Sequence, residues 1–158
     1  MEHKLNQTIE RTALSNLVSN EDYCRKVLPF IKPDYFSVKE ERIVFEEITN
    51  FVDKYRKMPT KISLEIEVET RKDLTETEHQ KIVEIIKTLD STDVDMEWLV
   101  DTTEKFCKDK AIYNAIVDGI GIIDGKDKNR GADAIPSLLT DALAVSFDNA
   151  VGHDYFDD

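Results

Sequence analysis

The sequence has few residues that interrupt secondary structure, with 5 glycines and 4 prolines among 158 residues. A fold built from many short strands would need more of both residues for its tight turns. The apolar residues mostly recur at steps of three and four, which is the spacing along one face of a helix. The sequence therefore predicts an all-α fold.

Cysteine and histidine are also scarce. The two cysteines, Cys24 and Cys107, lie far apart, and the three histidines, His3, His79 and His153, are scattered. This arrangement matches neither a disulfide framework nor the ligand spacing of a metal site. We therefore expect two free thiols and no bound metal.

Basic residues are fewer than acidic residues, since the sequence has 21 lysines and arginines and 33 aspartates and glutamates, for a net charge of -12. Such a chain repels phosphate backbones, so autonomous nucleic-acid binding is not expected. No apolar run approaches the roughly 18 residues that a membrane span requires, and the polar first residues do not resemble a signal peptide. We expect a soluble, cytoplasmic protein with no membrane contact.

Local patterns predict a helical globule over residues 1–90. Ser37 with Glu40, and Thr75 with Glu78, have the spacing of a capping box, in which each side chain accepts a hydrogen bond from a free backbone N–H of the other residue. Both boxes predict the start of a helix.

The segment 62–69 is ambiguous because its apolar and polar residues alternate as in a strand. No second alternating run is present to pair with it, so a strand would leave its backbone groups without partners. A short helix is therefore predicted. The alternating apolar residues are Ile62, Leu64, Ile66 and Val68.

A helical hairpin is predicted over residues 91–150, starting with a long helix from about residue 95 to about residue 124. The polar stretch 125–131 is typical of a turn, and Pro136 suits the first turn of a returning helix. Two helices cannot hide such wide apolar surfaces by pairing only with each other. Either the globule or a second hairpin must cover the remainder.

An apolar seam follows one side of this hairpin with heptad-like spacing. From the residues alone, the seam is either intramolecular core or partly a subunit interface. The candidate interface residues are Leu99, Phe106, Tyr113, Ile116, Ile120, Leu139, Leu143 and Phe147.

One basic cluster interrupts the acidic sequence at Lys54, Arg56, Lys57 and Lys61. Basic side chains near the end of a helix complement its dipole and increase solubility. The same cluster could also dock an acidic partner.

Catalytic, cofactor-binding and metal-binding residues are not predicted. The stretch 119–127, GIGIIDGKD, superficially resembles a phosphate-binding P-loop. However, Ile120 stands where that motif needs its first glycine, Asp127 stands where it needs serine or threonine, and no strand precedes it.

The end of the chain resembles the segment that joins the N-terminal domain to the motor in T-even-like phage helicases of the DnaB family. This resemblance is carried by residues 134–136 (AIP), 142–148 (ALAVSFD) and 151–158 (VGHDYFDD). Two further stretches are similar to the wider family. They are 33–36 (PDYF), followed by Arg42, Ile43 and Phe45, and 98–113, which resembles the first arm of the family's hairpin.

The resemblance implies a non-catalytic N-terminal domain of a replicative DNA helicase. In that family, hairpins of neighbouring subunits pair, and the N-terminal domains form a collar, a trimer of dimers, on the hexameric ATPase ring. The collar docks the primase and the helicase loader and meets single-stranded DNA only indirectly. ATP and magnesium would belong to the absent RecA-like motor of a 5′–3′ helicase in the host cytoplasm, and residues 151–158 would begin the linker to it.

Three alternatives remain at this level. The helicase-interacting domain of a primase would share the architecture, but such a domain should be the last domain of its protein. A free-standing acidic adaptor or nucleic-acid mimic would account for the negative charge. An enzyme has the least support, because no nucleophile with a base, metal set or phosphate loop can be assembled from these residues.

Overall fold

The computed structural model describes the backbone of residues 2–147 and the side chains of residues 8–147. This part of the chain contains helices and turns and no strand, so the prediction of an all-α fold is confirmed. The predicted linker 151–158 lies outside the described residues. The helices are α1 (Glu2–Ser19), α2 (Glu21–Val27), α3 (Lys39–Tyr55), α4 (Lys61–Glu69), α5 (Glu76–Lys87), α6 (Met96–Ile123) and α7 (Ile135–Leu143), with 3-10 turns η1 (Leu28–Phe30), η2 (Pro33–Tyr35) and η3 (Ala132–Ala134).

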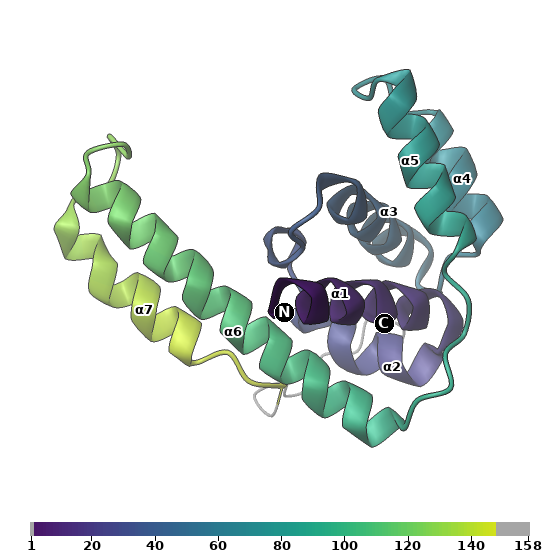
Figure 1. The fold of residues 1–158 in the computed structure, drawn as a ribbon, viewed down its shortest axis with the longest axis horizontal. Helices are drawn as coiled ribbons and strands as arrows, with labels where there is room; N and C mark the ends of the chain where they lie inside the picture. Colours follow the sequence, from purple (N-terminus) through teal and green to yellow (C-terminus); the bar gives the residue numbers. More distant parts are fainter. Residues whose placement is uncertain (1, 148–158) are drawn as a thin grey trace.

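The helices form a globule from which a hairpin projects (Figure 1). In the globule, α1 packs against α2 and α3, and the first part of α6 packs against α2 and α1. The α4–α5 pair lies on α3 at one end of the molecule, whereas the α6–α7 hairpin extends from the other end (Figure 1).

The core is one continuous cluster that draws side chains from α1 through α6. Both cysteines are buried and free, and burial raises the pKa of each thiol to about 12, so both stay protonated at neutral pH. The largest fully buried side chains are Leu14, Leu17, Tyr23, Phe36, Phe45, Ile48, Leu64, Ile82, Ile86, Leu89, Leu99 and Glu10.

The two predicted capping boxes have different outcomes. At the start of α5, the backbone N–H of Glu78 donates to Thr75 Oγ1 at 3.1 Å and the backbone N–H of Thr75 donates to Glu78 Oε1 at 2.9 Å, as predicted. The box at Ser37 and Glu40 is wrong, because α3 begins at Lys39 without a side-chain cap. The backbone N–H and hydroxyl of Ser37 donate instead to buried Glu10 on α1, at 3.0 and 2.9 Å.

The ambiguous segment is helical, which confirms the prediction of a short helix. As α4, it begins with a capping box of its own between Thr60 and Ser63. Leu64 and Val68 are fully buried, whereas Ile62 and Ile66 are 69% and 54% exposed. The alternation therefore marks two opposite faces of one helix rather than two faces of a sheet.

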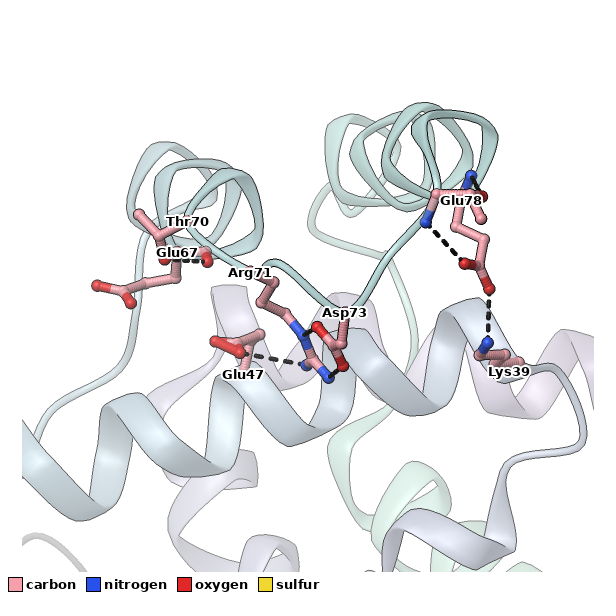
Figure 2. A network of polar contacts seen from close by, with 8 residues as sticks. Lys39, Glu47, Glu67, Thr70, Arg71, Asp73 and Glu78 are labelled. Carbon is pink, nitrogen blue, oxygen red and sulfur yellow. Dashed lines mark hydrogen bonds and ion pairs between the residues drawn. The ribbon is translucent and has the colours of Figure 1, made fainter.

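A polar network ties the turn between α4 and α5 to α3 (Figure 2). Arg71, in that turn, lies 3.4 Å from Glu47 on α3 and donates to Asp73 at 2.8 and 3.0 Å. At the start of α5, Glu78 accepts a 2.6 Å hydrogen bond from Lys39 on α3, and this bond helps hold the pKa of Glu78 at about 2. The α4–α5 pair is thus held to α3 at its inner side.

Candidate interaction surface

The first half of α6 belongs to the core of the globule. Leu99 and Phe106 are 1% and 5% exposed, and the Phe106 ring lies 6.5 Å from the Phe36 ring. Between them, Thr103 forms a buried 2.8 Å hydrogen bond with the hydroxyl of Tyr23 on α2. This half of the helix is therefore fixed to the globule by both apolar and polar contacts.

Two polar side chains of α6 reach the globule further along the helix. Lys110 Nζ donates to Ser37 Oγ at 3.0 Å and lies 3.9 Å from the carboxylate of buried Glu10. Asn114 donates to the backbone carbonyl of Asp34 at 3.2 Å. Beyond these contacts, α6 runs outward with α7 along its side (Figure 1).

The outer half of α6 carries a row of exposed apolar side chains, here called the hairpin stripe. Steps of three and four residues place its members on one face of the helix. The stripe consists of Tyr113 (62% exposed), Ile116 (49%), Val117 (48%), Ile120 (53%) and Ile123 (71%).

The opposite face of the same half-helix is the one that packs on α7. Ala115, Gly119 and Ile122 are buried there. A methyl group added at Gly119 would lie 3.8 Å from the Ile135 side chain, so the two helices pack closely at this point. Because α7 occupies this face, it leaves the hairpin stripe uncovered.

The hairpin stripe continues the face that the globule buries. Leu99, Phe106, Tyr113 and Ile120 follow each other at intervals of seven residues, and such positions turn only about 20° per step around a straight helix. The globule covers this face as far as Phe106, and the helix then extends past it. One face of α6 therefore has two environments.

The predicted interface divides accordingly. Leu99 and Phe106 are core residues within one chain, so the interface prediction does not hold for them. Tyr113, Ile116 and Ile120 are exposed. On the returning arm, Leu139 is half-buried and Leu143 is 70% exposed, while exposed Val117 was not among the predicted residues.

Phe147 is placed differently from its prediction. The returning helix ends at Leu143, so Phe147 does not belong to it. Its ring stacks on Phe30 at 4.6 Å, and its backbone N–H donates to Glu104 at 2.7 Å. The chain after α7 thus turns back to the globule, and Phe147 is not part of the hairpin's exposed surface.

The basic cluster does not act as a single free patch. Lys61 Nζ donates to the backbone carbonyl of Lys87 at 3.1 Å and pairs with Asp90. Lys54 lies 5.2 Å from the centre of the Tyr55 ring. Arg56 takes a left-handed conformation that ends α3, with its N–H bonded to the carbonyl of Val52. Lys57 is exposed. Part of the cluster is therefore engaged within the chain.

The stretch that superficially resembles a P-loop is the end of a helix. Its first five residues, 119–123, complete α6, and Gly125 follows with a φ of 75°, the left-handed geometry of a helix C-terminus. Within the described residues, no group of histidine, cysteine or acidic side chains is arranged to hold a metal ion. The same residues contain no helix long and apolar enough to cross a membrane.

Comparison with known proteins is consistent with this architecture. Residues 2–97 match the family described as DnaB-like helicase N terminal domain. The chain belongs to this family. It is also 32% identical over 153 residues to a DnaB-like replicative helicase of Enterobacteria phage T4, in an alignment that covers 92% of this chain and 32% of the relative. The chain thus spans about a third of that relative's length, and the likeness extends into the hairpin that the family match leaves out.

Proposed function

We propose that this chain is the non-catalytic N-terminal module of a phage replicative DNA helicase, and that it assembles subunits by pairing hairpins. The supporting observation is the hairpin stripe, a row of five apolar side chains that neither the globule nor α7 covers. Apolar surface of this kind is typical of a protein interface. In the complete protein, pairs of hairpins would build a hexamer.

Family membership supports a helicase N-terminal domain over the helicase-interacting domain of a primase, a free-standing acidic adaptor or a catalytic domain. ATP and magnesium would bind in a separate motor domain, so we expect the isolated chain not to hydrolyse ATP. Primase and helicase loader are the proposed docking partners in the host cytoplasm, and single-stranded DNA would be met only indirectly. The exposed part of the basic cluster, such as Lys57, is a candidate contact for an acidic partner.

Self-association can be tested by light scattering coupled to gel filtration at tens of micromolar protein. We expect a mass above the 18.2 kDa of one chain, because pairing would remove the hairpin stripe from water. Tyr113→Asp with Ile120→Asp should give the monomer mass with unchanged helical content, since both residues are exposed.

The matched control is Ile62→Asp with Ile66→Asp, which places the same two charges on similarly exposed apolar residues of α4. It should retain the mass of the unmodified protein. A protein that is monomeric at every concentration tested, or a double variant that associates as well as the control, would exclude pairing through the stripe.

A further inference from the structure

The α4 helix is apolar on two opposite sides. Leu64 and Val68 point into the core, while Ile62 and Ile66 lie one turn apart on the far side of the helix and are 69% and 54% exposed. These two isoleucines are here called the α4 outer face. A helix that only had to cover the core would need one apolar side. Within the described part of the chain, the second apolar side is largely exposed.

A groove adjoins the α4 outer face. It has a volume of about 530 Å³ and lies between the end of α4 and the middle of α5. Glu69, which lines the groove, follows Ile66 by three residues on α4, so the two lie next to each other on the same side of the helix. The groove is lined by Glu69, His79, Gln80, Val83 and Glu84.

The charge around this surface is mainly negative. Within the described residues, the Glu69 and Glu84 carboxylates at the groove form no ion pair or hydrogen bond with another side chain. Glu67 is exposed on the same helix, and Glu65 lies 4.0 Å from Lys87, which neutralises it in part. Apolar side chains beside unpaired carboxylates favour an occupant that is both apolar and basic.

The α4–α5 pair that carries this surface is fixed to α3, and the surface lies far from the hairpin. Arg71, in the turn of the α4–α5 pair, pairs with Glu47 on α3, and Lys39 on α3 pairs with Glu78 on α5 (Figure 2). The α4–α5 pair and the α6–α7 hairpin lie at opposite ends of the molecule (Figure 1). A partner on α4 would therefore leave the hairpin free to pair.

We propose that the α4 outer face and its groove bind a basic amphipathic helix of a partner protein. Apolar side chains one turn apart on that helix would pack on Ile62, Ile66 and Val83, and its lysines or arginines would pair with Glu69 and Glu84. This deepens the docking role proposed above and rests on it. It does not depend on hairpin pairing or on the basic cluster at the end of α3.

The test uses the full chain and a labelled synthetic peptide of about 18 residues, designed as a helix with leucines four apart and lysines beside them. Fluorescence anisotropy measures its affinity. Ile62→Ser with Ile66→Ser should weaken binding about tenfold or more, because anchor residues carry most of an interface's affinity. Glu69→Lys with Glu84→Lys should bind the basic peptide less tightly than a second peptide, which is identical except that glutamates replace the lysines.

Two controls separate this surface from the hairpin. Tyr113→Asp with Ile120→Asp should bind the basic peptide as the unmodified protein does, even where it abolishes self-association. A peptide with the same composition in scrambled order should bind at least about tenfold more weakly, because it has no apolar face.

Three results would overturn the proposal. The first is equal peptide affinity for the Ile62→Ser, Ile66→Ser variant and the unmodified protein. Absence of binding by the unmodified protein is the second. The third is self-association that the serine variant abolishes and the hairpin variant does not, since the occupant would then be a second copy of this chain.

Discussion

The buried hydrogen bond between Tyr23 and Thr103 joins α2 to α6, and the structure determines which of the two hydroxyls is the donor. Thr103 Oγ1 donates its only hydrogen to the carbonyl of Leu99 at 2.7 Å. Burial raises the pKa of Tyr23, so its hydroxyl keeps its proton at neutral pH. Tyr23 is therefore the donor and Thr103 the acceptor in their 2.8 Å bond.

Removal of the acceptor and removal of the donor should therefore have different costs in stability. Thr103→Val leaves the Tyr23 hydroxyl buried with no acceptor, which should cost about 1–3 kcal/mol of unfolding free energy. Tyr23→Phe leaves Thr103 bonded to Leu99 and removes only its incoming bond, for about 0.5–1.5 kcal/mol. The double variant should lose about 1 kcal/mol less unfolding free energy than the two single losses added together, because it contains no buried Tyr23 hydroxyl without an acceptor.

Urea unfolding followed by circular dichroism measures these differences. Thr49→Val is the matched control, because Thr49 makes the same hydrogen bond to the carbonyl four residues back, with Phe45 at 2.9 Å. It should cost less than Thr103→Val. The assignment of donor and acceptor would be refuted if Tyr23→Phe were the more damaging change, or if the single effects added fully in the double variant.

Two further changes test other parts of the fold. Burial raises the pKa of Glu41 above its ordinary value of 4.5, and Arg11, 3.1 Å away, lowers this pKa by a smaller amount. Protonated Glu41 therefore contributes stability that is lost as the pH rises above 4.5. The unfolding free energy of the protein relative to Glu41→Gln should thus fall between that pH and neutrality in urea titrations, and a constant difference would contradict this. Phe30→Ala removes the ring that holds Phe147, so it should cost about 1 kcal/mol and speed proteolysis after α7; an unchanged cleavage rate would contradict the contact.

Elements fixed by neighbouring residues could be predicted from the sequence. The box at Thr75 and Glu78 forms as predicted because both partners lie within one turn. The box at Ser37 fails because Glu10, distant in sequence but buried beside it, offers a carboxyl oxygen that accepts from both the backbone N–H and the hydroxyl. A competitor brought by tertiary packing cannot be seen from local spacing.

The candidate surface was predictable only in part for the same reason. Periodicity correctly assigned Leu99, Phe106, Tyr113 and Ile120 to one side of a helix, but it does not report how far the globule reaches along that side. The change from core to exposed surface occurs between Phe106 and Tyr113. The apolar pattern of the returning helix predicts Phe147 as part of the hairpin, whereas its environment is set by Phe30 and Glu104.

The sequence by itself determined the helical class, the long helix with its returning arm, and the family, because hydrophobic period, helix caps and motif residues are local properties. Tertiary structure alone decided which apolar faces are covered. Burial depends on what packs against a helix, and that is why Ile62 and Ile66 of α4 and the hairpin stripe of α6 remain exposed to water.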